Sequence, residues 1–176
     1  MQREYRFDAA HSRASFTARH MMITNVRGTF SGVEGSVVYD PDKPEATTLE
    51  AVIPASTVDT REPARDTHLK SADFLDVDKF PTITFRSKKV TPAGDGELHV
   101  TGDLTIHGTT NEVTLNVDGP TDEAKDPWGN LRIGASAATK IKRSAFGLTW
   151  NAAIESGGLL VGDDLKIDLD VSLIRV

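Results

Sequence analysis

The residue types best suited to chemistry fall in one stretch in the first half of the chain. Arg65, Asp66 and His68 stand close together there, and these side chains are typical of an acid–base or ion-pair site. A structural interpretation competes with this one. In it, Asp66 pairs with Arg65 or Lys70, or with a distant arginine such as Arg143, and ties the segment to the rest of the fold. We favour the structural interpretation.

No other part of the sequence completes a catalytic or metal-binding motif. The five histidines include no pair at ligand spacing, such as two histidines four residues apart on a helix. The acidic run Asp73, Asp76 and Asp78 lacks the glycine and the terminal glutamate of an EF-hand. No serine lies in a G-x-S-x-G sequence, and no glycine cluster is followed by the Lys-Ser/Thr of a phosphate loop. We therefore expect no catalytic residue, no metal site and no cofactor.

Composition and charge disfavour further classes of function. The chain has 176 residues, is 38% hydrophobic and carries a net charge of -6 at pH 7, which suits one domain, residues 1–176, and argues against nucleic-acid binding. No segment approaches the roughly 18 apolar residues of a membrane helix, so we expect no stable membrane insertion. Without cysteine, neither a disulfide nor a thiolate ligand can form. The first residues, MQREYRFDAAHS, contain no apolar signal region. We expect a cytoplasmic protein for the chain as given, and a periplasmic or secreted one if a signal has been removed.

One short helix is predicted, at about residues 61–72. Pro63 suits its first turn, where a missing N–H has no consequence, and Thr60 just before it can cap the free amides. Small and apolar residues recur at helical spacing through the rest of the segment. A single helix in a chain that is otherwise β is expected to cover part of the β structure.

All other patterned segments alternate apolar and polar residues, as strands with one buried face do. The clearest is residues 97–106, where Leu98, Val100, Leu104 and Ile106 share one face. Further strands are predicted at residues 4–8, 12–20, 36–39, 47–55, 82–90, 111–118, 132–142, 148–155 and 164–176. A sandwich and a closed barrel both fit this series.

Strand length and small side chains favour the barrel. Several strands are about ten residues long, or roughly 33 Å, which is long for a sandwich. Gly102, Ala135 and Ala137 put small side chains on apolar faces, which would leave space inside. An eight-stranded barrel is wide enough either to be filled by side chains or to hold one slender ligand. We expect the ligand-holding form, and a filled barrel that serves as an interaction domain is the alternative.

Motifs in a fixed order along nearly the whole chain resemble those of the YceI-like family of polyisoprenoid-binding proteins. The matching runs are DAAHS at 8–12, VRGTF at 26–30, RDTHL at 65–69, ADFLD at 72–76, FPTITF at 80–85, GDLTIHG at 102–108 and RSAFGL at 143–148. The resemblance implies an all-β fold, an extended, lipocalin-like antiparallel barrel of eight strands with one short helix near its mouth. It also implies that the barrel holds a long isoprenoid or a related lipid without chemistry.

From the resemblance and the apolar faces, we predict a non-catalytic protein that carries or stores a polyisoprenoid, an isoprenoid quinone or a related lipid. The predicted ligand-binding residues are Phe16, Phe30, Leu49, Ile53, Leu69, Phe74, Phe85, Val100, Leu104, Ile106, Leu115, Ile141 and Phe146. The helix would act as a lid, with Leu69, Phe74 and Leu75 turned towards the interior. An enzyme that uses the cluster of Arg65, Asp66 and His68 at the barrel mouth is the alternative. The sequence leaves the identity of the lipid open, as well as the choice between monomer and homodimer.

Overall fold

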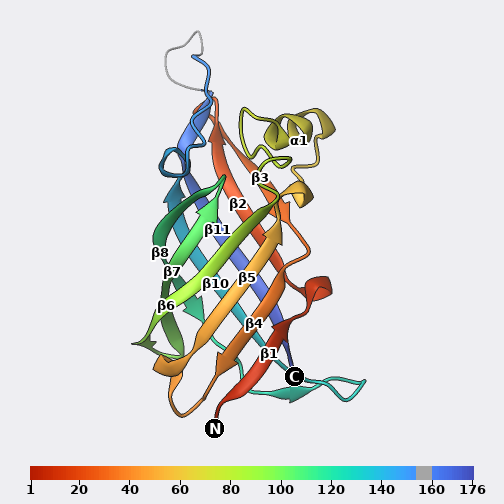
Figure 1. Cartoon of the computed structure of the whole chain (residues 1–176), viewed down its shortest axis with the longest axis vertical. Helices are drawn as coiled ribbons and strands as arrows, with labels where there is room; N and C mark the ends of the chain where they lie inside the picture. Colours follow the sequence, from red (N-terminus) through yellow and green to blue (C-terminus); the bar gives the residue numbers. More distant parts are fainter. Residues whose placement is uncertain (154–159) are drawn as a thin grey trace.

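The computed structural model describes residues 1–153 and 160–176, which form a long barrel of antiparallel strands (Figure 1). The strands are β1 (Arg3–Phe7), β2 (Arg13–His20), β3 (Thr24–Phe30), β4 (Glu34–Tyr39), β5 (Thr48–Pro54), β6 (Thr82–Gly94), β7 (Glu97–Ile106), β8 (Thr109–Asp118), β9 (Ala124–Lys125), β10 (Leu131–Lys142) and β11 (Val161–Arg175). One α-helix, α1 (Pro63–Lys70), interrupts this series between β5 and β6.

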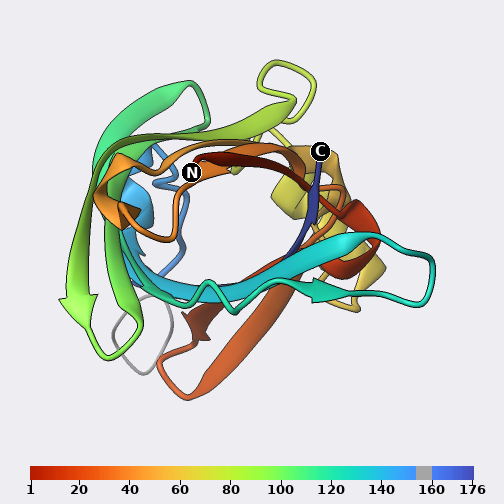
Figure 2. The same ribbon diagram turned by 90° about the horizontal axis from the view of Figure 1, so that it is seen from below.

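Eight of these strands close the barrel. In the order of their hydrogen bonds they are β1, β4, β5, β6, β7, β8, β10 and β11, and β11 pairs back with β1. Tyr5 lies opposite Arg175 in this last pairing, so the two ends of the chain meet at one rim of the barrel (Figure 2). The predicted extended eight-stranded antiparallel barrel with one short helix is confirmed.

The β2–β3 hairpin prolongs the barrel wall at the other end. After a 3₁₀ turn at Ala9–His11, β2 continues along β11, and β3 pairs with β2. The alternation rule does not predict β3, because Gly28 and the polar residues around it break the apolar pattern. The strand predicted at residues 148–155 is wrong over 148–152, which are irregular, and the end of that range lies outside the described residues.

The helix α1 is shorter than the predicted 61–72, although Pro63 does stand in its first turn. The prediction that Thr60 caps the helix is wrong. The N-cap residue is Glu62, and Arg61 before it has a φ of 63°, so the chain turns between Thr60 and the helix. Across the described ranges, no helix has both the length and the apolar character needed to cross a membrane.

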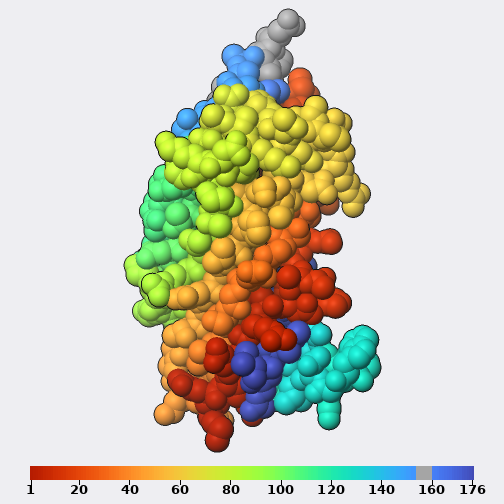
Figure 3. Space-filling view, turned by 45° about the vertical axis from the view of Figure 1, so that its right-hand side comes forward, coloured from red at the N-terminus to blue at the C-terminus, as the bar shows by residue number. Residues whose placement is uncertain are grey.

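The helix and the loop that follows it cover the barrel end opposite to the chain termini (Figures 1 and 3). None of the residues of α1 is buried, whereas Phe74 and Leu75 in the loop are. Leu75 packs in an apolar cluster with Val58, Phe146 and Leu148, among others, and this cluster closes the helix end. The loop therefore closes this end of the barrel more than the helix does.

Candidate functional site

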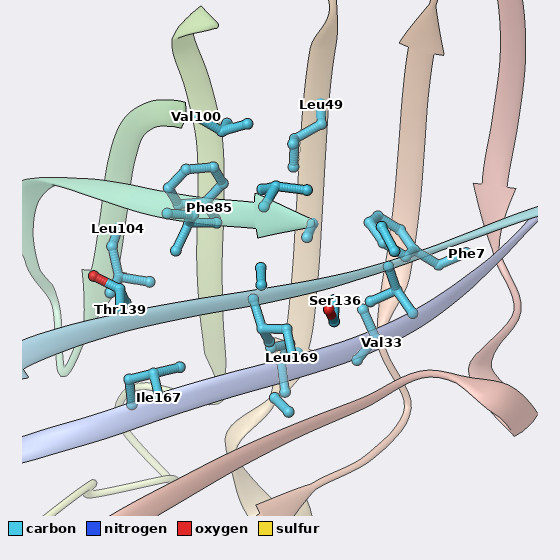
Figure 4. Close-up of a pocket in the computed structure, with 18 of the residues that line it drawn as sticks. Phe7, Val33, Leu49, Phe85, Val100, Leu104, Ser136, Thr139, Ile167 and Leu169 are labelled. Atoms are coloured by element: carbon cyan, nitrogen blue, oxygen red, sulfur yellow. The ribbon is translucent and has the colours of Figure 1, made fainter. Parts of the chain in front are cut away.

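An apolar cavity lies inside the barrel. Inward-facing residues of every barrel strand contribute to its wall, because side chains alternate between the two faces of a strand. Among the residues that the structure describes, no charged side chain lines the cavity. Figure 4 shows Leu49, Val100 and Leu169 converging on it from β5, β7 and β11, and the only oxygen atoms on the labelled side chains belong to Ser136 and Thr139.

The cavity is large enough to rule out a barrel filled by its own side chains. The space open to the centre of a water-sized sphere is about 200 Å³. One water molecule needs about 10–15 Å³ by the same measure. With an apolar wall, this space suits hydrocarbon better than water. The geometry and the fold together support the binding of an apolar ligand inside the barrel.

Small side chains on the wall help to keep the cavity open. Ala135 and Ala137 on β10 line it as anticipated, and Ala14 and Ala51 add two more small residues from β2 and β5. The expectation that Gly102 also leaves space was wrong. A Cβ on Gly102 would stand 2.6 Å from Phe85 Cζ, so the ring of Phe85 occupies the volume that the missing side chain frees.

Ten of the thirteen residues that the sequence assigned to the ligand lie in the cavity wall. They are Phe16, Phe30, Leu49, Ile53, Phe85, Val100, Leu104, Ile106, Leu115 and Ile141. Several further wall residues were missed. The alternation of the last strand was recognised and could have supplied Ile167 and Leu169, whereas Val33 lies alone between Gly32 and Glu34, where no pattern points to it.

The other three residues assigned to the ligand do not line the cavity. Leu69 and Phe146 pack in the apolar cluster that closes the helix end, where Leu75 is also buried. Phe74 packs instead against His68 and Trp150, with ring centroids 5.0 and 5.3 Å away. The predicted lid is therefore formed by Leu69 and Leu75, while Phe74 anchors the loop from the side.

The end of the cavity near the termini carries polar groups. Tyr39, at the end of β4, and Thr47, just before β5, both line it. Burial raises the pKa of the Tyr39 phenol, and the nearby carboxylates of Asp122 and Asp40 raise it further, so the phenol stays neutral at pH 7. A neutral hydroxyl at this end can hydrogen-bond to a polar group of a ligand without placing a charge against the apolar chain.

The cluster of Arg65, Asp66 and His68 does not form a joint site. The Asp66 carboxylate accepts hydrogen bonds from the backbone N–H and the hydroxyl of Thr60, at 2.8 and 2.5 Å. Arg65 donates to the hydroxyl and the carbonyl of the same buried Thr60, at 2.8 and 2.9 Å. His68 faces another way, towards Asp73 at 2.8 Å and the ring of Trp150. This arrangement ties α1 to the segment before it, so the cluster is structural, but Asp66 bonds to Thr60 and not to the predicted Arg65 or Lys70.

Arg143 is engaged elsewhere, so the proposed pairing with Asp66 was wrong. Its guanidinium is buried and donates to the backbone carbonyls of Leu148, Trp150, Val161 and Gly162. Desolvation in this site lowers the pKa of Arg143 from its usual value. Its role is to join the irregular residues 148–150 to the start of β11.

Among the described residues, no three His, Asp or Glu side chains are placed to hold a metal ion. One charge cluster within the same residues joins Arg132 to Asp8 and Asp126, at 2.7 and 2.6 Å. It lies outside the cavity and ties β10 and the β9–β10 turn to the residue that directly follows β1. These groups do not converge on an open space where a substrate could react.

A closed antiparallel barrel of eight strands around an uncharged cavity is a lipocalin-like barrel. The model of the YceI-like domain matches residues 5–173, and the chain belongs to this family.

Individual relatives agree with this assignment. A UPF0312 protein of Staphylococcus aureus is 37% identical over 165 residues, which cover 93% of each chain. The crystal structure of BcnA from Burkholderia cenocepacia superposes with a TM-score of 0.80 at 25% identity, over 94% of this chain and 98% of that one. The structure of a polyisoprenoid binding domain from Saccharophagus degradans, at 16% identity and with 98% of both chains covered, shares the fold with a TM-score of 0.71.

Proposed function

We propose that the protein binds one long apolar molecule, a polyisoprenoid, an isoprenoid quinone or a related lipid, inside the barrel and carries or stores it without chemical change. The observation that carries this proposal is the cavity wall, which has apolar residues on every barrel strand and no charged side chain within residues 1–153 and 160–176. Family membership supports the ligand class, because YceI-like proteins are expected to hold isoprenoids.

The physical basis of binding is the transfer of hydrocarbon out of water. Each CH₂ group buried contributes about 0.8 kcal/mol, so a chain of ten carbons can be held with few polar contacts. A wall made mostly of Leu, Ile, Val and Phe has few directional groups that could select a single lipid. Selectivity would then depend on chain length and width, with Tyr39 and Thr47 available for a polar end.

Lipid extraction and native mass spectrometry of the purified protein test the proposal. We expect a co-purified isoprenoid, quinone or other long-chain lipid, or uptake of an added prenyl lipid with a stoichiometry of one. A protein that is free of lipid and also ignores added prenyl lipids would overturn the proposal.

A matched pair of variants tests whether the ligand binds inside the barrel. Ala137 lines the cavity, whereas its neighbour Ala138 does not. Ala137→Phe should abolish or strongly reduce lipid uptake, because the ring would fill the bore, and Ala138→Phe should leave uptake unchanged. Equal uptake by the two variants would show that the lipid binds elsewhere.

An enzyme based on Arg65, Asp66 and His68 has less support. Two of these side chains are used to hold Thr60, and none of the three lines the cavity. We therefore propose that these residues are structural.

A further inference from the structure

Three consecutive apolar side chains project into solvent at the tip of the β2–β3 hairpin. Met21, Met22 and Ile23 are 40%, 61% and 69% exposed. The other large apolar residues exposed in the described ranges are isolated: Met1 and Val176 are the chain ends, and Val52 and Trp128 stand alone. The hairpin tip is at the helix end of the molecule, above the barrel (Figure 1).

The backbone of this turn holds the side chains in that position. Met21 and Met22 have φ values of 52° and 59°, in the left-handed region. In the turn of a β-hairpin, Asn and Gly favour left-handed backbone positions, and other residues adopt them at a cost in conformational free energy. The turn is fixed by hydrogen bonds from Met21 N–H to the Leu160 carbonyl at 2.7 Å and from Ile23 N–H to the His20 carbonyl at 3.1 Å. An ordered turn with two methionines therefore presents apolar groups where polar residues would be easier to accommodate.

Cationic side chains lie just below the tip on the outer face of the sheet. Arg19 is the first, two residues before Met21, and it also hydrogen-bonds to the Met22 carbonyl. Arg27 and Lys166 follow in the next outward row, on either side of Thr17. In the described part of the chain, none of these three cations has a carboxylate within 4.0 Å.

Two of the nearby carboxylates are engaged with other residues. Asp163 accepts hydrogen bonds from Ser144, and Asp164 pairs with Lys142 at 2.8 Å. Among the described residues, the surface hollow below the tip is lined by four cations, Arg13, Arg27, Arg61 and Lys166, and by two carboxylates, Asp59 and Asp168. This face is therefore net positive in a chain whose net charge is -6. An apolar tip with a positive collar is complementary to the interface of an anionic bilayer, where acyl chains lie beneath phosphate groups.

We propose that the β2–β3 hairpin is a membrane-docking element, in which Met21, Met22 and Ile23 enter the interfacial layer of an anionic bilayer and Arg19, Arg27 and Lys166 bind the lipid phosphates. A protein partner fits less well. Stable protein interfaces bury about 800 Å² on each side, far more than three side chains of a turn provide. A bilayer needs no shape-complementary surface, and flexible methionines adapt to it.

Vesicle co-sedimentation tests this inference. The full chain should bind vesicles of phosphatidylcholine with about one third phosphatidylglycerol, and it should bind phosphatidylcholine vesicles alone much more weakly. Binding to the anionic vesicles should fall as salt is raised, because salt screens the charges.

Three variants separate the apolar and the ionic contributions. Met22→Ser combined with Ile23→Ser should weaken binding about tenfold or more on anionic vesicles. Arg27→Gln and Lys166→Gln should each weaken it about fivefold, and neither should change the weak binding to neutral vesicles. Trp128→Ser is the control, since Trp128 is 81% exposed and lies on the β9–β10 turn, away from the hairpin.

Three results would overturn the inference. Unchanged vesicle binding by the Met22/Ile23 double variant would exclude the tip, and loss of binding in Trp128→Ser would move the contact to the other end of the barrel. A dimer of the parent chain in size-exclusion chromatography that the double variant abolishes would show that a second copy covers the tip. Thermal unfolding confirms that each variant is folded. The outcome is independent of the proposed cavity function, because a protein that carries lipid yet ignores vesicles would contradict only the docking inference.

Discussion

The ring of Phe16 lies over Gly28, its partner across the β2–β3 ladder. A Cβ on Gly28 would stand 2.2 Å from Phe16 Cζ, far closer than two carbon atoms can approach. Gly102 has a similar contact with Phe85, diagonally across the β6–β7 ladder: its Cβ would stand 2.6 Å from Phe85 Cζ, although its direct partner is Ser87. In both cases the glycine makes room for an aromatic ring at the cavity wall, as when an aromatic side chain shields a glycine on a neighbouring strand.

Gly28→Ala should therefore destabilise the protein. The new methyl group forces the Phe16 ring to move, and overpacking of this kind typically costs about 1–3 kcal/mol. Because Phe16 lines the cavity, uptake of a prenyl lipid should fall as well. Urea denaturation and lipid stoichiometry measure the two effects.

Gly134→Ala is the matched control. Its Cβ would meet only the Val171 carbonyl oxygen, at 3.6 Å, which is an ordinary contact. We expect a change in stability within about 0.5 kcal/mol. Equal losses in the two variants would mean that the aromatic contact is unimportant.

Asp66→Ala should lower stability while leaving lipid uptake intact. The variant deprives the buried backbone N–H of Thr60 of its acceptor, and an unsatisfied buried group costs about 1–3 kcal/mol. Asp73→Ala is the comparison, because that carboxylate is 51% exposed and its loss should change stability by less than about 1 kcal/mol. A stable Asp66→Ala protein that had lost lipid uptake would contradict the structural role of this residue.

Arg143→Lys should be strongly destabilising despite keeping the charge. An ammonium group cannot reach the four carbonyls that the guanidinium holds, and leaving two of them unpaired costs about 2–5 kcal/mol. Arg86→Lys serves as control, since Arg86 is 76% exposed and its pair with Glu50 is worth less than about 1 kcal/mol. Equal midpoints of urea unfolding for the two variants would contradict a stabilising role of the Arg143 hydrogen bonds.

Stability in acid should depend on Asp126. Hydrogen bonds from Arg132 lower the pKa of Asp126 from 3.8 to about 2, and bonds from Asn130 and Trp128 contribute. A carboxyl whose pKa is lower in the folded state contributes its full stability above the unfolded value, near pH 4, and loses it as the pH falls through about 2.

Asp126→Asn should be less stable than the parent at pH 6, and the difference should shrink between about pH 4 and pH 2. Denaturant unfolding at several pH values measures this difference, which isolates Asp126 from the other carboxylates, such as Asp8, whose pKa is also lowered. A difference that stayed constant down to pH 2 would be inconsistent with the role of this carboxylate.

The barrel was predictable because the side-chain period of a strand is fixed at two residues. Along β7, the alternation of Leu98, Val100, Leu104 and Ile106 was enough to assign the inner face, and all four line the cavity. The same rule missed β3, where Gly28 replaces an inward side chain. The ring of Phe16 on the neighbouring strand β2 fills the space of that side chain. A contact between two strands cannot be predicted from the pattern of one strand alone.

Contacts between segments that are far apart in the chain could not be predicted from the sequence. Phe146 and Leu69 look like wall residues because they are apolar, yet both pack in the cluster that closes the barrel end. Arg143 was expected to need a carboxylate, and the structure satisfies it with backbone carbonyls instead. Which partner a buried polar group uses depends on how irregular segments meet, and alternation says nothing about that.

The pairing of β11 with both β10 and β1 has a consequence for folding. The barrel cannot close until the last strand has formed, since the residues opposite Tyr5 are among the final ones of the chain. During synthesis, β11 is made after the other strands, so β1 lacks a permanent neighbour on that side until β11 has formed. Contacts between such distant parts of a sequence form slowly. Until then, the future cavity wall is an open apolar surface, and a lipid present during synthesis could be enclosed as the barrel closes around it.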